Sequence, residues 1–195
     1  MFLHRIFKVL MLSSGMLLSI YTCSKDQSIT LTVGDTAPSF TANDQNGNLW
    51  NSAEHFGKKT IIVYFYPAAM TGGCTKQACG FRNDLLPLKE IDAEVVGISA
   101  DPVENLKIFE QTYNLNFTLL SDINGYIAES FGVPVYEGGT VHVETDGINI
   151  SLNRAFTLAR WTYIIDTTGT IVYKNTAVDA GNDSRHVTKF LKKNR

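Results

Sequence analysis

The stretch Lys-Thr-Ile-Ile-Val-Tyr-Phe-Tyr at residues 59–66 is the clearest strand signal in this sequence. It is a nearly continuous run of apolar, β-branched and aromatic residues, which is typical of a strand buried on both faces of a sheet. Pro67 ends the run, and a loop from Ala68 to Gly73 follows it. Residues 74–86 then have the apolar spacing of a helix. This region therefore predicts a central strand, a short loop and a helix that begins at Cys74.

Working outward, strand and helix signals alternate along the rest of the chain. Strands are expected at 29–33, 94–99, 117–120, 161–166 and 170–174, a hairpin at 40–49, and helices at 102–113, 126–131, 152–158 and 183–193. We expect the helix that begins at Cys74 to kink or end at Pro87. The order predicts one α/β domain at residues 28–195, with a thioredoxin-like fold in which helices flank a central mixed sheet.

The first two dozen residues differ in kind from the rest. His4, Arg5 and Lys8 give a basic start, and residues 9–20 are largely apolar. This pattern is typical of a secretory signal, and the apolar stretch is shorter than the roughly 20 residues of a membrane-spanning helix. We therefore expect residues 1–22 to be a signal peptide and the protein to be exported.

The end of this leader allows two outcomes. Residues 20–23, Ile-Tyr-Thr-Cys, resemble a bacterial lipobox, in which the cysteine is lipidated, but small residues are usual where Tyr21 and Thr22 stand. Either Cys23 is lipidated and tethers the protein to the membrane, or ordinary cleavage near Ser24 releases it into the periplasm. Both outcomes leave Cys74 and Cys79 as an even pair of thiols.

Composition and net charge indicate a globular protein and argue against a nucleic-acid-binding function. Of 195 residues, 44% are hydrophobic and 18% are charged, as in an ordinary globular protein. The formal net charge of −2 provides no electrostatic footprint for a nucleic-acid partner.

The two remaining cysteines carry the chemistry of interest. The first turn of a helix stabilises an anion and lowers the pKa of cysteine thiols in general, so the sequence predicts a thiolate at Cys74. On an ideal helix, residues five apart have Cα atoms about 8.7 Å apart, whereas disulfides need less than roughly 7 Å. Cys74 and Cys79 are thus either a structural disulfide on a non-helical chain, or a catalytic pair that bonds when the helix unwinds.

Several segments resemble the peroxiredoxins. The pattern Pro67-x-x-x-Thr71-x-x-Cys74 resembles their active-site signature, and residues 74–82 resemble the bacterioferritin-comigratory (PrxQ) subfamily of the AhpC/TSA family. Further similarities lie at 33–40, 96–101, 119–122, 131–133 and 160–166. The resemblance implies a thiol-specific peroxidase that reduces hydrogen peroxide and organic hydroperoxides, needs no cofactor or metal, and is recycled by a thioredoxin-like reductant. It also favours a monomer.

The resemblance assigns a role to each site residue. Cys74 is the peroxidatic nucleophile, and Cys79 resolves the sulfenic acid as an intramolecular disulfide. Arg160 holds the thiolate and polarises the departing oxygen. Thr71 hydrogen-bonds the peroxide, and Pro67 shields the site from water.

Some of these assignments have competing readings. Arg82 and Arg154 are rival cationic partners for the thiolate, and Thr71 is equally suited to cap the helix. His142 and His186 are expected on the surface. The sequence also departs from the subfamily: Gly72 replaces a usual proline, and the segment 134–159 is longer than typical members have.

Two other functions compete with the peroxidase. A thioredoxin-like thiol–disulfide oxidoreductase normally carries Cys-x-x-Cys, whereas Cys74 and Cys79 have four residues between them. A Sco-like copper-binding module pairs Cys-x-x-x-Cys with a distant histidine. Copper binding by the two thiols stays open on ligand chemistry alone. Copper titration and peroxide consumption by the same reduced sample separate these readings.

Overall fold

The computed structural model describes residues 30–145 and 147–194. The expected signal peptide, Cys23 and Ile29 lie outside the described residues. A seven-stranded mixed sheet forms the centre, in the order β2-β1-β5-β4-β3-β8-β9. Its strands are β1 (Thr41–Asp44), β2 (Leu49–Asn51), β3 (Thr60–Phe65), β4 (Ala93–Ser99), β5 (Thr118–Ser121), β8 (Trp161–Ile165) and β9 (Ile171–Asn175). The expected thioredoxin-like arrangement, with helices on a central mixed sheet, is confirmed.

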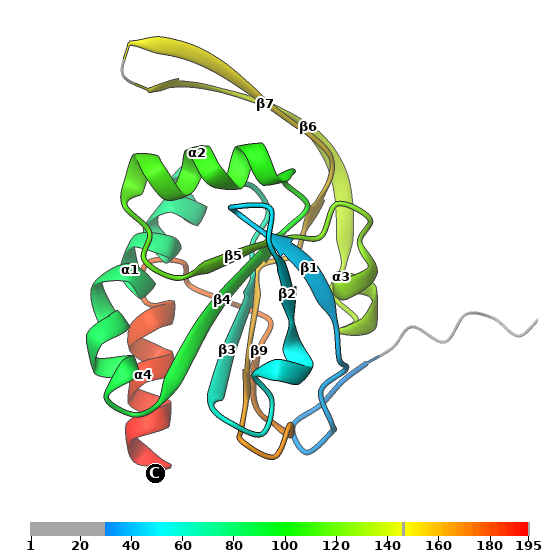
Figure 1. Cartoon of the computed structure of the whole chain (residues 1–195), viewed down its shortest axis with the longest axis vertical. Helices are drawn as coiled ribbons and strands as arrows, with labels where there is room; N and C mark the ends of the chain where they lie inside the picture. The colour runs from blue at the N-terminus through cyan, green and yellow to red at the C-terminus, as the bar shows by residue number, and fades with distance from the viewer. Residues whose placement is uncertain (1–29, 146, 195) are drawn as a thin grey trace, which may run out of the picture.

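The helices cover both faces of the sheet (Figure 1). They are α1 (Gly72–Lys89), α2 (Val103–Tyr113), α3 (Tyr126–Ser130) and α4 (Asp183–Lys193), with a short 3-10 turn, η1 (Ser52–Glu54). Buried side chains of α1, α2 and α4 belong to one core cluster, and those of α3 belong to the other. The sheet is therefore the middle of three layers.

Strand β3 is the central element because alternate side chains enter the two cores. Ile62 and Tyr64 pack into the cluster under α1, whereas Ile61, Val63 and Phe65 pack into the cluster under α3. All five side chains are fully buried. The strand pairs parallel with β4 and antiparallel with β8, so it lies inside the sheet as its apolar run predicts.

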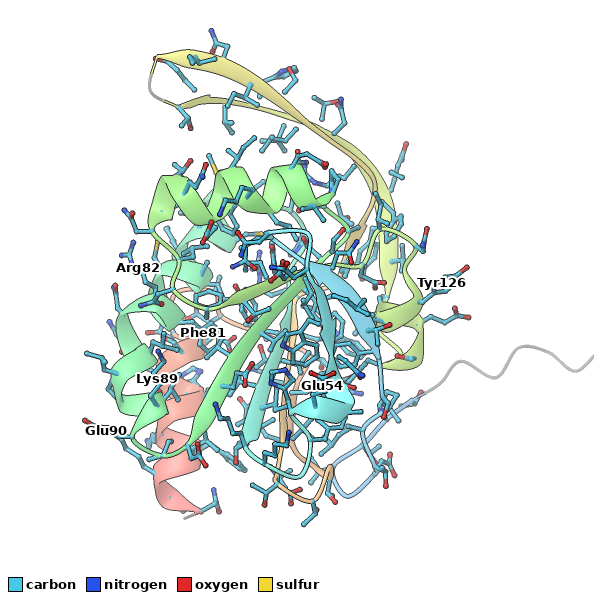
Figure 2. All side chains as sticks on the ribbon, in the orientation of Figure 1. Glu54, Phe81, Arg82, Lys89, Glu90 and Tyr126 are labelled. Atoms are coloured by element: carbon cyan, nitrogen blue, oxygen red, sulfur yellow. The ribbon has the colours of Figure 1, made fainter. Side chains whose placement is uncertain are left out.

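Helix α1 begins at Gly72, two residues before the expected start at Cys74, and continues past the expected break. Phe81 points from its inner side and stacks on Tyr64, with ring centroids 4.9 Å apart (Figure 2). Pro87 lies inside the helix, so the prediction that the helix ends at this proline is wrong. The helix ends two residues later at Lys89, so the missing N–H weakens only its last turn.

The long segment after α3 is an antiparallel hairpin of β6 (Val135–Thr145) and β7 (Ile148–Leu158). It extends over α2 as a curved arm (Figure 1). The expected helix at 152–158 is therefore wrong. Leu152, Arg154 and Leu158 are buried at alternate positions, and the inward-facing arginine hides the period-two pattern of the strand.

Two further findings concern the start of the domain and the membrane. Residues 30–33 form no strand, because Asp35 accepts the N–H of Thr32 at 2.6 Å in a tight turn. Within 30–145 and 147–194, no helix combines the length and apolar character that crossing a bilayer requires.

Candidate active site

Cys74 is the third residue of α1 and is only 1% exposed. The first hydrogen bond of the helix runs from the N–H of Thr75 to the carbonyl of Thr71, at 2.8 Å. The N–H groups before it have no intrahelical acceptor, and the first turn carries no acidic residue. The backbone around the sulfur therefore favours an anion, as the sequence predicts.

Arg160 supplies the positive charge at this sulfur. It directly precedes β8, where Trp161 pairs with Phe65 at the end of β3. Its Nη2 donates to Cys74 Sγ at 3.3 Å, and its Nη1 donates to Gln77 Oε1 at 2.6 Å. The cysteine is buried, and the guanidinium lies where it could pair with a thiolate.

The rival arginines lie elsewhere. Arg82 lies on α1 and donates to the carbonyl of Tyr113 at 2.5 Å (Figure 2). Arg154 donates to Asp101 Oδ1 through Nε at 2.9 Å and through Nη2 at 2.7 Å. Of the three candidates, the structure brings only Arg160 to the sulfur.

Gly73 makes the approach of the guanidinium feasible. A Cβ atom at residue 73 would lie 3.3 Å from Arg160 Nη2, which is tighter than ordinary side-chain contacts. At Gly72 the same atom would meet nothing within 4 Å. The departure from the usual proline therefore falls at an open position, whereas the next glycine touches the site.

We expect Gly73→Ala to slow alkylation of Cys74 by iodoacetamide several-fold at neutral pH, because the methyl group displaces the guanidinium from the sulfur. A misplacement of about 1 Å is enough to cost up to roughly a hundredfold in a well-aligned site, so a shift of a few tenths should cost less. Gly72→Ala is the matched control, since it changes helix propensity equally but enters open space. Equal rates in both variants would contradict this contact.

The loop between β3 and α1 is stabilised by a hydrogen bond within the loop and by contacts with Asp101. Thr71 occupies the N-cap position, but its side chain makes no cap bond; instead Oγ1 donates to the carbonyl of Ala68 at 2.8 Å. Met70 has φ +65°, a left-handed conformation that is unusual for a side chain of this size. The surrounding contacts must therefore stabilise this backbone.

Asp101 provides the contact from outside the loop. Its Oδ2 accepts the N–H of Ala69 at 2.8 Å and the hydroxyl of Ser99 at 3.0 Å. Its Oδ1 accepts from Arg154 on β7 and from Asn105 on α2, at 3.2 Å from Asn105 Nδ2. A fully buried ion pair thus joins the hairpin to the loop that leads to Cys74.

The second thiol lies on the same helix. Cys79 is partly exposed, and both cysteines are free. This agrees with the argument that an intact helix keeps residues five apart from bonding. The pairing itself stays a prediction.

Two buried tyrosines adjoin the site. Tyr64 and Tyr66 belong to the same core cluster as Cys74 and are fully buried. Burial raises the pKa of both phenols well above the usual value, so they remain neutral. Neither phenol therefore adds a negative charge that would compete with a Cys74 thiolate for Arg160.

A cavity of about 360 Å³ has Arg160 among its lining residues. Its lining includes Pro67, Tyr136, Trp161 and Val178. Pro67 is partly buried there and forms an apolar wall next to the guanidinium. This agrees with a shielding position for the proline.

In the part of the chain that the structure describes, no group of three or more His, Cys, Asp or Glu side chains is placed to hold a metal ion. His142 and His186 are exposed, as expected. His142 Nδ1 lies 2.9 Å from Ser151 Oγ on the neighbouring strand.

Sequence reasoning missed two buried carboxylates behind the site, Asp101 and Asp183. Asp183 Oδ2 accepts from Gln77 Nε2 at 2.7 Å across 106 residues of sequence. Asp183 signals only a helix N-terminus in the sequence, because nothing local marks its long-range partner.

Comparison with known proteins gives a consistent family. Residues 33–174 match the AhpC/TSA family model. The chain is 39% identical over 164 residues to the chloroplastic peroxiredoxin Q of Sedum lineare, covering 83% of this chain and 77% of that protein. It is 48% identical over 103 residues to the peroxiredoxin Bcp of Escherichia coli, covering 53% of this chain and 65% of that protein.

The fold gives the same answer. The crystal structure of the peroxidoxin BcpB from Mycobacterium tuberculosis superposes with a TM-score of 0.70 at 30% identity, covering 84% of this chain and 97% of that one. Residues 33–174, which match the family model, include both Cys74 and Arg160.

Proposed function

Because this chain belongs to the AhpC/TSA family and resembles its peroxiredoxin Q and Bcp members, we propose that it is a thiol peroxidase that uses Cys74 as its nucleophile. The single observation that carries the proposal is the 3.3 Å contact between Arg160 Nη2 and Cys74 Sγ at the start of α1. A thiolate stabilised by a guanidinium and a helix N-terminus is the reactive form of cysteine.

In the proposed first step, the Cys74 thiolate attacks the terminal oxygen of a hydroperoxide. A sulfur–oxygen bond forms as the O–O bond breaks, which oxidises the sulfur to sulfenic acid and releases an alkoxide or hydroxide. The leaving oxygen takes up a proton and departs as an alcohol or water. Arg160 supports this step because its charge lies where the negative charge moves.

Thr71 suits a role as acceptor. Its hydroxyl proton is already committed to the carbonyl of Ala68, at 2.8 Å, so the oxygen keeps lone pairs for the O–H of a peroxide. We propose that Pro67, which lines the adjacent cavity, limits access of water.

In the proposed second step, the Cys79 thiol attacks the Cys74 sulfenic acid, which forms the disulfide and releases water. The helix must unwind locally, because an ideal helix holds the two Cα atoms about 8.7 Å apart. A thioredoxin-like dithiol then reduces the disulfide and is itself oxidised.

We expect Cys79→Ser to consume one equivalent of peroxide and then stall when thioredoxin is the reductant. The serine hydroxyl cannot form a disulfide, so the sulfenic acid persists after the first equivalent, and only excess peroxide oxidises it further. Mass spectrometry should find one or more added oxygen atoms on the peptide with Cys74. Undiminished turnover with thioredoxin would contradict the role of Cys79.

The activity itself is tested by a coupled assay with thioredoxin, thioredoxin reductase and NADPH. We expect NADPH oxidation that requires both peroxide and this protein. If the reduced, folded protein leaves hydrogen peroxide and an organic hydroperoxide unconsumed, the proposed function is wrong.

We also propose that the protein is exported and acts as a monomer. The basic and then apolar composition of residues 1–22 supports cleavage of a signal peptide. Mass spectrometry of the mature N-terminus, and of any lipid on Cys23, tests this and separates a membrane tether from periplasmic release.

A further inference from the structure

Asp183 is a buried carboxylate that the proposed chemistry does not use. It is the first residue of α4 and is 1% exposed. Its Oδ2 accepts from Gln77 Nε2 and from Thr162 Oγ1, both at 2.7 Å. Its Oδ1 has no partner within residues 30–145 and 147–194. Burying a carboxylate is unfavourable without compensation, so this placement calls for a reason.

The reason is visible in the orientation of the Gln77 amide. An amide presents a donor on one side and an acceptor on the other. The carboxylate of Asp183 requires the donor, so Nε2 faces it, and Oε1 is left to accept from Arg160 Nη1 at 2.6 Å. A flipped amide would turn its N–H groups toward the guanidinium, which has no acceptor to offer.

The amide also keeps the two charges apart. If a carboxylate touched Arg160 directly, it would compete with the thiolate for the same guanidinium. With neutral Gln77 between them, Arg160 is held at Nη1 while Nη2 remains on Cys74 Sγ at 3.3 Å. The chain Asp183–Gln77–Arg160–Cys74 thus joins the start of α4 to the start of α1.

We propose that Asp183 is a positioning residue of the peroxidase site, which fixes the Gln77 amide so that Arg160 stays on the Cys74 sulfur. The inference rests on the proposed function only for its consequence in catalysis; the effect on the thiolate can be measured without peroxide. The ionisable groups that interact electrostatically with Asp183 are Arg160 and His186, together with the phenols of Tyr64 and Tyr173.

When Asp183 is replaced by a neutral residue, electrostatics and positioning predict changes of opposite sign in the thiolate content of Cys74. Loss of a nearby negative charge would by itself favour a thiolate, because like charges disfavour each other. Loss of the acceptor for Gln77 would release Arg160 and disfavour the thiolate. The sign of the change in thiolate content therefore identifies which effect dominates.

The test compares Asp183→Leu with Asp183→Asn, each in a Cys79→Ser background, and follows iodoacetamide alkylation of Cys74 over a pH series. We expect Asp183→Leu to move the midpoint of the alkylation curve upward by about one pH unit, and to slow reaction with peroxide about tenfold. Asp183→Asn keeps an acceptor oxygen for Gln77 and should remain near the parent. Thr162→Val is the matched control, because it removes the other donor to Asp183 without touching the Gln77 contact.

A midpoint in Asp183→Leu that is unchanged or shifted to lower pH would overturn the proposal. If that variant does not fold, as judged by near-ultraviolet circular dichroism, Gln77→Met removes the same link from the other side and should give the same upward shift. The alkylation result stands even if the parent consumes no peroxide, so failure of this inference and failure of the proposed function are distinguishable.

Discussion

Cys74→Ser is expected to abolish turnover of peroxide with thioredoxin, lowering the rate by roughly 10⁴-fold or more, on the scale seen when a catalytic nucleophile is removed. A serine hydroxyl in this setting is not ionised and cannot become a sulfenic acid. The variant should keep its fold, because the change replaces one small buried side chain by another of similar shape. The measurement is NADPH oxidation in the coupled assay, with circular dichroism as the check on folding.

Thr75→Ser provides a matched control one residue along the same helix turn. It removes a single methyl group from a partly exposed residue and leaves the sulfur in place. We expect near-parental turnover. Full activity in Cys74→Ser would contradict the assignment of the nucleophile, whatever the control shows.

Arg154→Met is expected to lower the free energy of unfolding by about 3–5 kcal/mol, because it leaves the buried carboxylate of Asp101 without its cationic partner. Side chains of both residues are almost inaccessible, at 2% and 0%, so solvent cannot replace the lost charge. The same carboxylate holds the N–H of Ala69, so we also expect slower reaction of Cys74. Urea denaturation followed by circular dichroism measures the stability.

Two further variants test the cause of the stability loss predicted for Arg154→Met. Arg185→Met removes an exposed arginine on α4 and should change stability by no more than about 0.5 kcal/mol. Adding Asp101→Asn to Arg154→Met removes the unpaired charge, and should recover part of the loss. A double variant less stable than Arg154→Met alone would mean that burial of charge is not the cause.

The sequence predicts the fold well where the pattern is local and strong. Strand β3 and the start of α1 follow from an apolar run, a proline and a helical repeat. The wrong helix prediction at 152–158 has a clear cause. Arg154 lies on a strand and faces the protein interior, whereas a charged residue in a sequence normally indicates a solvent-facing position. The carboxylate of Asp101, which is distant in sequence, stabilises that arginine inside the protein.

The sequence predicts the two residues at the centre of the site, but not the residues that surround and position them. Cys74 is marked by its place at a helix start, and Arg160 by family resemblance; the structure brings them together. Gly73 gave no sign that it borders the guanidinium. Asp183 contacts Gln77 from 106 residues away, and no local pattern encodes such a pair. Contacts of this kind depend on how the sheet and helices pack.

The hairpin of β6 and β7 shows how a long segment can be built into a site without supplying a reacting group. A side chain at Gly138 would collide with the backbone of Arg154 and Ala155, so glycine is required where the strands approach. Leu152 is buried against the core under α1, and Asn105 donates to the carbonyl of Asn153 at 3.3 Å. The hairpin is therefore anchored along the middle of β7, where Arg154 reaches the loop.

The most direct test of the central claim is stopped-flow mixing of the reduced Cys79→Ser protein with one equivalent of hydrogen peroxide, followed by peptide mass spectrometry. We predict loss of thiolate absorbance in step with consumption of peroxide, and one added oxygen atom on Cys74. Arg160→Met should slow both signals together. Oxygen found on another residue, or a rate that does not depend on Arg160, would contradict the account.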